Sequence, residues 1–440
     1  MSTTKASSSR PPRRGSRRPT NVLFNIDAVV GIHNSRTTAE DRTRNGKAIQ
    51  VSFCLKRPPQ PSTLYVYSSD LNRSLPPEIL YSVDDLLLLR VNMGSGPCIS
   101  RGRDYDYFVY RADSTRPSLE LLRRPHPYLS CSSAGLLPRP DGHYTVAALN
   151  FTGTVHQFEL HLFHSDTSTW ISRMLSVDAP LDFPVKIPRN CGRLFDHHTT
   201  TVITIGGEGG TMGWVDLWRD ILLCDVLVGQ PSLRSMPIPL PSVEMSYNNG
   251  QGIELGSPVQ RRGITFIRDK GCLRLVHLEM TEVWDDEEAG LTSIRVDDWA
   301  LTTWSNKKMS SSLEDWHKES VVKASSIAID PAISQVLEDT GLLRRPRENE
   351  AARNLQNLSM SLPSPCISGE DIVYLVAREK FMHPKAWILS VDMKNGRLRS
   401  AAYFCTRRYR GLDFIYCPSR MSKYMNPATT PVTVRKDAEE

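Results

Sequence analysis

The 440-residue chain is 40% hydrophobic and 23% charged, which is typical of a globular protein and excludes a fibrous or largely disordered chain. No uninterrupted apolar run approaches the ~20 residues of a membrane-spanning helix, so we expect no membrane insertion. The net charge of +6 resides in residues 1–20, which hold six basic side chains and no acidic one. The rest of the chain carries 48 basic and 48 acidic side chains, and this balance argues against a nucleic-acid-binding face on the folded body.

The first 20 residues are rich in Ser, Pro and Arg and contain almost nothing apolar. Such a segment cannot bury enough surface to fold alone, so we expect residues 1–20 to form a disordered tail. Its arginine pairs would also suit a nuclear-import signal or an arm that attracts nucleic acid, and its lack of acids would suit an organelle transit peptide. Because the segment has no apolar core, we expect no secretion. An intracellular location is therefore predicted, in the nucleus or cytoplasm unless this segment directs organelle import.

The nine cysteines are scattered along the chain, and no two of them have the two-residue spacing of zinc or redox motifs. Several lie in apolar runs, as Cys224 does, which is typical of reduced thiols in the core of an intracellular protein. The cysteines are Cys54, Cys98, Cys131, Cys191, Cys224, Cys272, Cys366, Cys405 and Cys417.

From Val22 onward, short stretches of apolar, β-branched and aromatic residues alternate with turn residues, a pattern that predicts strands. In the first half, strands are expected at 22–27, 49–55, 63–67, 86–91, 105–110, 118–122, 144–150, 155–164, 170–176 and 199–205. In the second half, they are expected within 214–241 and at 263–268, 272–280, 299–304, 324–330, 372–378, 386–393 and 398–405.

Between these strands, three segments predict loops: residues 31–50 are polar, residues 124–143 are rich in Pro and Gly, and residues 331–360 are polar and charged, with room for one short helix. The stretch 75–80, Leu-Pro-Pro-Glu-Ile-Leu, imitates the opening of an F-box. We reject an F-box because the amphipathic helices that it requires do not follow.

The strand-turn-strand pattern recurs along the chain at spacings typical of propeller blades, and helical periodicity is absent over any long window. The sequence therefore predicts an all-β fold. A β-propeller of six or seven irregular blades is favoured because it uses this length with few exposed edges. Two packed β-sandwich-like domains are the alternative. We expect one body over residues 21–425, with a polar, partly helical insert at 331–360 and a tail at 426–440.

Residues 214–241 form the most distinctive stretch. It begins Trp-Val-Asp-Leu-Trp-Arg-Asp-Ile-Leu-Leu-Cys-Asp and ends Pro-Ile-Pro-Leu-Pro. It resembles the core signature of DUF1618, a plant domain of unknown function that is expanded in grasses. Other segments follow in the order of that family, from Leu64-Tyr65-Val66-Tyr67 to Pro418–Tyr424, so the resemblance spans roughly 21–425. The family implies no established activity, cofactor or catalytic residue, and none is carried over.

No catalytic motif stands out, since the chain has neither a Gly-x-Ser-x-Gly elbow nor a convincing Cys/His pair. The glycine run 206–213 follows an expected strand but lacks the spacing of a dinucleotide fingerprint and the Gly-Lys-Ser/Thr of a P-loop. It predicts a flexible loop between strands.

Two groups of potential metal ligands are weak candidates. His197 and His198, with Asp196 and Cys191, could bind one ion only from an irregular loop, because neighbours on a strand point to opposite faces. The run Asp285-Asp286-Glu287-Glu288 lacks the spacing of a calcium loop and predicts a solvated segment.

The tryptophans Trp214, Trp218, Trp299, Trp304, Trp316 and Trp387 are expected in the core or between blades, with some as anchors of an interaction face. Within the signature, Asp216, Asp220 and Asp225 are the polar positions worth testing, and we expect a structural role for each.

The sequence thus predicts no catalytic, cofactor-binding or metal-binding residue. We expect a non-enzymatic scaffold that binds a protein partner, without membrane association. One alternative is a hydrolase-type enzyme with a site assembled from distant loops, which a propeller can host without local motifs. A second alternative is nucleic-acid association through the basic tail.

Overall fold

The computed structural model describes most of the chain between residues 21 and 425. The described segments are 21–72, 75–93, 105–123, 128–178, 196–240, 257–286, 292–343, 355–380, 383, 385–405 and 415–425. The expected tails, 1–20 and 426–440, lie outside the described residues.

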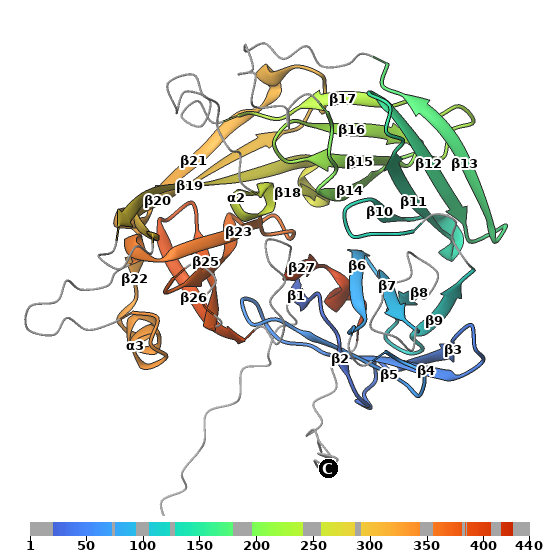
Figure 1. Cartoon of the computed structure of the whole chain (residues 1–440), viewed down its shortest axis with the longest axis horizontal. Helices are drawn as coiled ribbons and strands as arrows, with labels where there is room; N and C mark the ends of the chain where they lie inside the picture. Colours follow the sequence, from blue (N-terminus) through green and yellow to red (C-terminus); the bar gives the residue numbers. More distant parts are fainter. Residues whose placement is uncertain are drawn as a thin grey trace, which may run out of the picture.

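The described strands form six sheets arranged around a central axis (Figure 1), five with four strands and one with five, together with a two-stranded pair. Each of the six sheets is a blade, and the blades are numbered I to VI in chain order. Blades II to V are antiparallel meanders in which each strand pairs with the next along the chain. This arrangement confirms the predicted all-β propeller, with the described strands forming six blades in one ring rather than two packed sandwiches.

Blades II to V each contain four strands, written from the axis outward. Blade II comprises β6 (Glu78–Val83), β7 (Leu86–Asn92), β8 (Tyr105–Arg111) and β9 (Ser118–Leu122). Blade III comprises β10 (Ala134–Pro138), β11 (Tyr144–Phe151), β12 (Gln157–His164) and β13 (Thr169–Ser176). Blade IV comprises β14 (Thr201–Gly206), β15 (Thr211–Asp216), β16 (Asp220–Asp225) and β17 (Arg234–Pro237). Blade V comprises β18 (Arg262–Ile267), β19 (Cys272–Asp286), β20 (Thr292–Asn306) and β21 (His317–Lys323).

Blades I and VI are less regular. Blade VI comprises β23 (Ser359–Pro365), β24 (Ile372–Arg378), β25 (Lys385–Asp392), β26 (Arg397–Cys405) and the short outer strand β22 (Ala328–Ile329). Blade I comprises β2 (Val29–Val30), β5 (Thr63–Ser68), β4 (Ala48–Cys54) and β3 (Ala39–Arg42), with β1 (Val22–Asn25) and β27 (Tyr416–Ser419) on its inner side.

The two ends of the described chain close the ring. Strand β1 pairs antiparallel with β27 from Val22↔Ser419 to Asn25↔Tyr416. Phe24 of β1 also bridges to Ser62, directly before β5. The innermost strand of blade I therefore comes from the carboxyl-terminal part of the chain, so the first and last blades cannot separate without breaking this pairing.

Two α-helices lie among the described elements, α2 (Pro258–Arg261) before β18 and α3 (Pro331–Asp339) between β22 and β23 of blade VI. Helix α3 begins with Pro331 at its first position, and Asp330 caps it by accepting a hydrogen bond from Ala332 N. Neither of these helices is long and apolar enough to cross a membrane.

The hydrophobic core is divided among the interfaces between blades. Trp214 and Trp218 of the signature and Trp299 are among the largest fully buried side chains. Two indoles bond from one blade to the next: Trp214 Nε1 donates to Ser133 O at 2.8 Å, and Trp316 Nε1 donates to Pro237 O at 2.9 Å. The predicted core and blade-packing role of these tryptophans is confirmed.

Three strands, two of them near the axis and one on the rim, were predicted as loops or overlooked. Strand β10 lies inside the Pro- and Gly-rich segment 124–143, β6 overlaps the F-box-like stretch, and β3 lies inside the polar segment 31–50. These strands are short or rich in small residues, so they lack the alternation that marks the outer hairpins. Close packing at the axis also requires small residues on an inner strand that was expected: a Cβ at Gly263 of β18 would lie 1.9 Å from the carbonyl oxygen of Pro363 in β23.

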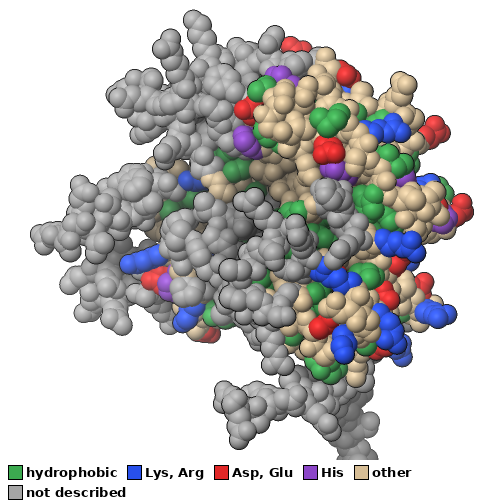
Figure 2. Space-filling view, turned by 45° about the vertical axis from the view of Figure 1, so that its right-hand side comes forward, with side chains coloured by type: hydrophobic (Ala, Val, Ile, Leu, Met, Phe, Trp, Pro, Cys, Tyr) green, Lys and Arg blue, Asp and Glu red, His purple; other side chains and the backbone are tan. Residues whose placement is uncertain are grey.

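Acidic and basic side chains are interspersed on the face in Figure 2, and no single sign dominates its coloured surface. This distribution agrees with the balanced charge of the chain after residue 20.

Candidate functional site

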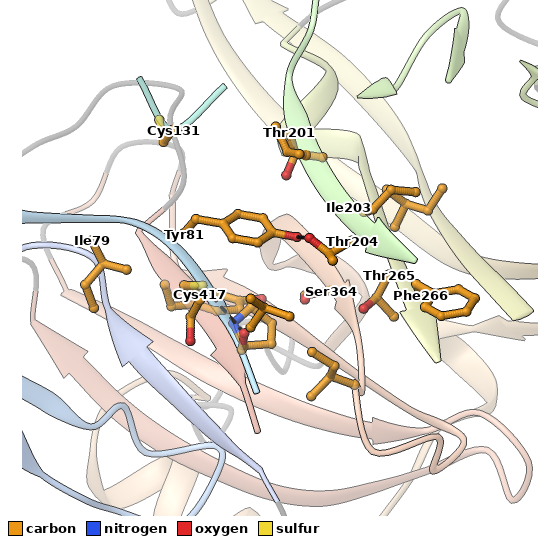
Figure 3. A pocket seen from close by; sticks show the side chains of 18 of the residues that line it. Ile79, Tyr81, Cys131, Thr201, Ile203, Thr204, Thr265, Phe266, Ser364 and Cys417 are labelled. Carbon is orange, nitrogen blue, oxygen red and sulfur yellow. Dashed lines mark hydrogen bonds between the residues drawn. The ribbon is translucent and has the colours of Figure 1, made fainter. Parts of the chain in front are cut away.

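A cavity of about 170 Å³ lies at the centre of the ring, where inner strands from different blades face one another (Figure 3). Its lining is mostly aliphatic and hydroxyl-bearing. This central cavity is lined, among others, by Ile79, Tyr81, Cys131, Thr201, Ile203, Thr204, Thr265, Phe266, Ser364, Cys417 and, at one end, Asp84, Arg268 and Arg420.

A chain of hydrogen bonds crosses the cavity wall from blade II through blade IV to blade III. Thr204 Oγ1 donates to Leu136 O at 2.7 Å, so the Tyr81 hydroxyl, 2.9 Å from Thr204 Oγ1, is its donor. Burial raises the pKa of Tyr81 well above its usual range. The phenol therefore stays protonated at neutral pH and keeps an acceptor lone pair available.

Three further hydroxyls reach the cavity from three successive blades: Thr201 on β14, Thr265 on β18 and Ser364 on β23. Their oxygens point into the central space in Figure 3. Within the described part of the chain, no hydrogen-bond partner is assigned to any of the three.

Charged groups occur where inner strands end. Asp84, Arg268 and Arg420 each directly follow an inner strand, β6, β18 and β27 respectively. Arg268 pairs with Asp84 at 2.8 Å, and Arg420 pairs with Asp269 at 2.7 Å. The hydrogen bond from Arg420 lowers the pKa of the Asp269 carboxyl. These pairs join blades I, II and V and leave the cavity without a net charge from this end.

The central cavity offers little for acid–base or nucleophilic chemistry. Burial raises the pKa of the Cys417 thiol to about 12, so the nucleophilic thiolate is scarce at neutral pH. Among the described lining residues there is no histidine or glutamate, and the aspartate, Asp84, is paired with Arg268.

The acid–base groups are instead gathered in a buried cluster of blade IV, built from His197, Thr199, Asp220 and Ser235. His197 Nδ1 lies 2.6 Å from Asp220 Oδ1, and His197 Nε2 lies 3.1 Å from Thr199 Oγ1. Ser235 Oγ donates to Asp220 Oδ2 at 2.6 Å. Asp220 and His197 are almost fully buried.

This His197–Asp220 cluster has the hydroxyl–imidazole–carboxylate order of a catalytic triad. The adjoining cavity, however, is only about 10 Å³, which is room for one water at most. Desolvation would raise the pKa of Asp220, but hydrogen bonds from His197 and Ser235 and the charges of His197 and Arg219 outweigh it, so this pKa lies below its usual range. The cluster ties the segment before β14 to the turn between β15 and β16.

The other two aspartates of the signature are also bonded within the fold. Asp216 is fully buried and accepts from His198 N at 2.8 Å and from Trp218 N at 3.0 Å. Asp225 accepts from Thr211 Oγ1 at 2.5 Å. Asp216, Asp220 and Asp225 thus each make the structural contacts that we expected.

The glycine run forms the turn between β14 and β15, as predicted. Gly206, Gly207 and Gly210 have φ values of +89°, +83° and +64°, in the left-handed region that favours glycine. The run therefore serves backbone geometry at this turn.

The proposed metal ligands are not brought together. His197 is bonded to Asp220, while Cys191 lies outside the described residues. The side chains of the acidic run 285–288 are likewise not described. Among described side chains, no group of three His, Cys, Asp or Glu is placed to hold a metal.

Sequence reasoning did not single out the cavity-lining residues. Tyr81 lies on an unexpected strand, and Thr201, Thr204 and Thr265 lie on expected strands where threonine is ordinary. The recurrence of Ser or Thr on inner strands of different blades was the available signal, but it required knowing which strands face the axis.

Comparison with known proteins gives a family-model match over part of the chain and no activity. The family model described as "Protein of unknown function (DUF1618)" matches residues 214–374 and begins at the first residue of the signature. No curated protein matches the chain. The wider resemblance over 21–425 stays a prediction.

Among solved structures, similar chains include an alpha-L-arabinanase of Penicillium chrysogenum, at 10% identity and a TM-score of 0.25 over 88% of this chain and 99% of that chain. Another is the hydrazine synthase of Kuenenia stuttgartiensis, at 12% identity and a TM-score of 0.32 over 88% of this chain and 81% of that one. Scores this low carry no argument about function. Residues 214–374 thus match the model of DUF1618, a family of unknown function.

Proposed function

We propose that the protein is a non-enzymatic scaffold that binds an extended segment of a partner protein along the outer strand of blade III. The observation that carries this proposal is strand β13, which has eight residues and pairs with β12 without a bulge. No described strand pairs with its other edge. An unpaired strand edge offers a row of backbone donors and acceptors to an added strand.

The other outer strands carry features that block such addition. Strands β3 and β17 have four residues each, and β17 ends in a proline. Asp41 of β3 accepts a hydrogen bond from Leu121 N of β9, so these two edges cover each other. Strand β21 has a bulge against β20 and the charged sequence His-Lys-Glu-Ser-Val-Val-Lys. In blade VI, β22 pairs along part of β26. Strand β13 has one charged residue, Arg173.

The side chains of β13 indicate what the partner brings. Ile171 is 40% exposed and Met174 is 60% exposed. Residues three apart in a strand face opposite sides of the sheet. A strand with apolar side chains on both faces would cover both residues, so we propose an extended, largely apolar segment as the occupant.

The hydrolase alternative rests on the Asp220–His197–Thr199 chain. We do not adopt it, because the space beside that chain is about 10 Å³ and the larger central cavity lacks a described base. It would require that Thr199→Val abolish a hydrolytic activity while leaving the fold intact.

The proposal also covers residues 1–20 and the location of the protein. The six basic side chains of residues 1–20 support salt-sensitive nucleic-acid association as a secondary property, which deletion of these residues would remove. The proposal also includes a location in the nucleus or cytoplasm and an origin in the grass-expanded plant branch of the family.

The test compares three full-length proteins as bait in affinity capture: the wild type, an Ile171→Lys/Met174→Lys variant, and Val321→Lys. Val321 is a matched control, because it is 48% exposed on the outer strand of another blade. We expect a partner that binds the wild type and Val321→Lys and is lost from the double variant. Capture of the same proteins by all three baits, or of no specific protein, would contradict the proposal.

A further inference from the structure

We propose that the central cavity binds a small, uncharged, polyhydroxylated molecule built on a six-membered ring. This inference is independent of partner binding at β13, because the cavity is lined by inner strands of several blades, whereas β13 is the outer strand of blade III at the rim (Figure 1).

The polar groups of the cavity match hydroxyl groups. Thr201, Thr265 and Ser364 present oxygens from three successive blades (Figure 3). Each hydroxyl can both donate and accept, so it can pair with a ligand hydroxyl in either direction. Tyr81, whose proton is used toward Thr204, adds an acceptor beside them. Because groups on different inner strands converge, a ligand with hydroxyls around its ring could engage several of them at once.

The remaining walls suit the carbon skeleton of such a molecule. Ile79, Ile203 and Phe266 line the cavity between the hydroxyls. The volume of about 170 Å³ is close to the roughly 150 Å³ of an engineered protein cavity that binds benzene. The space is therefore adequate for one six-membered ring.

The charge pattern excludes ions as the preferred ligand. Arg268 and Asp84 neutralise each other at 2.8 Å, and Arg420 is engaged by Asp269 at 2.7 Å. A charged ligand would have to enter a site whose described lining offers no uncommitted opposite charge. Desolvation of that charge would be uncompensated, whereas an uncharged polyol avoids this cost.

The test is isothermal titration of the full-length chain with myo-inositol and D-glucose as probes. D-Glucuronate, glucosamine and cyclohexanol, which keep the six-membered ring, test the effects of negative charge, positive charge and missing hydroxyls. We expect saturable binding of at least one neutral polyol and at least tenfold weaker binding of the three comparison compounds. No saturable binding of either polyol, or equal binding of the charged compounds, would overturn the proposal.

Variants locate the site. Thr201→Val/Thr265→Val/Ser364→Ala should weaken polyol binding at least tenfold, while Thr169→Val, an exposed change on β13, should leave it unchanged. Thr265→Ser keeps a hydroxyl and should retain binding within about threefold, which separates loss of the hydroxyl from loss of the fold. Undiminished binding by the triple variant would place the ligand elsewhere and overturn the assignment.

Discussion

The His197–Asp220 cluster and the central cavity divide the polar chemistry of this propeller between them. The cluster holds an imidazole, a carboxylate and two hydroxyls within 3.1 Å contacts, but the space beside it is about 10 Å³. The cavity has about 170 Å³ but is lined by hydroxyl, aliphatic and ion-paired groups. The cluster therefore stabilises the fold, because there is no room for a ligand beside it. The central cavity has room for a ligand, and its lining suits binding rather than acid–base chemistry.

The difference between the two regions shows that a triad-like order of side chains, such as Asp220–His197–Thr199, does not by itself indicate catalysis. An Asp–His–hydroxyl chain is also an efficient way to fix a loop, because every buried polar atom then has a partner. Here it links the residues before β14 to the tight turn of the signature. The predictions below test this division, beginning with the cluster.

The largest effect is expected from Asp220→Ala. Removing the carboxylate deletes the contacts that Asp220 makes with His197, Ser235 and Arg219, and breaking a buried ionic pair typically costs about 3–5 kcal/mol of folding free energy. Urea unfolding followed by circular dichroism measures it. Asp225→Ala is the matched control, because Asp225 bonds to Thr211 and is only partly buried, and its loss should cost about 1 kcal/mol. Equal losses for the two variants would remove the special role of the cluster.

A pH dependence is expected from His277, which packs beside Trp218 of the signature with ring centroids 6.2 Å apart. Burial, reinforced by the positive charges of Arg262 and Arg261, lowers the pKa of His277 to about 2. Below pH ~6.5 the His277 imidazole binds a proton in the unfolded chain but stays neutral in the folded chain. The free energy of unfolding therefore falls with falling pH, by at most about 1.4 kcal/mol per pH unit.

His277→Gln keeps an acceptor for Arg262, whose Nε lies 3.3 Å from His277 Nδ1, but cannot titrate. Urea midpoints of the wild type and this variant at pH 7.5, 6.5, 5.5 and 5.0 should diverge below pH 6.5, with the variant losing less. Parallel curves would show that His277 does not resist protonation.

A smaller effect is expected from Trp214→Phe, which removes the indole donor to Ser133 O between blades IV and III. Ser133 O keeps the hydrogen bond that it accepts from Leu149 N at 3.1 Å, so the variant loses one hydrogen bond, which is worth about 0.5–1.5 kcal/mol. Thermal unfolding should show a lower midpoint for this variant. Trp170→Phe is the control, because its indole bonds to Arg123 O in an exposed setting, and its midpoint should shift less than that of Trp214→Phe.

The smallest effect on stability is expected from Thr265→Val in the cavity. No described partner is assigned to this hydroxyl, so replacing it with a methyl group should change the unfolding free energy by less than about 0.5 kcal/mol. A loss comparable to that of Asp220→Ala would show that the cavity hydroxyls serve the fold.

The sequence predicted the middle strands of the blades well, and it missed some strands at the axis, such as β6 and β10, and some at the rim, such as β3 and β21. Strands such as β8 and β24 alternate apolar and polar residues or form long β-branched runs, and their bounds differ from expectation by a residue or less. Strands β10 and β27 contain glycine or proline and lack this alternation, and β6 directly follows the two prolines of the F-box-like stretch. The signature indicated Asp220, but the convergence of Thr201, Thr265 and Ser364 depends on ring closure, which no local pattern encodes.

The most direct measurement follows urea unfolding of Asp220→Asn, the Thr201→Val/Thr265→Val/Ser364→Ala variant and the wild type, each with and without myo-inositol. Asp220→Asn should have a lower midpoint and keep the wild-type increase caused by the polyol. The triple variant should have a near-wild-type midpoint and lose that increase. The reverse assignment, with polyol stabilisation lost in Asp220→Asn or folding lost in the triple variant alone, would contradict the division between a structural cluster and a binding cavity.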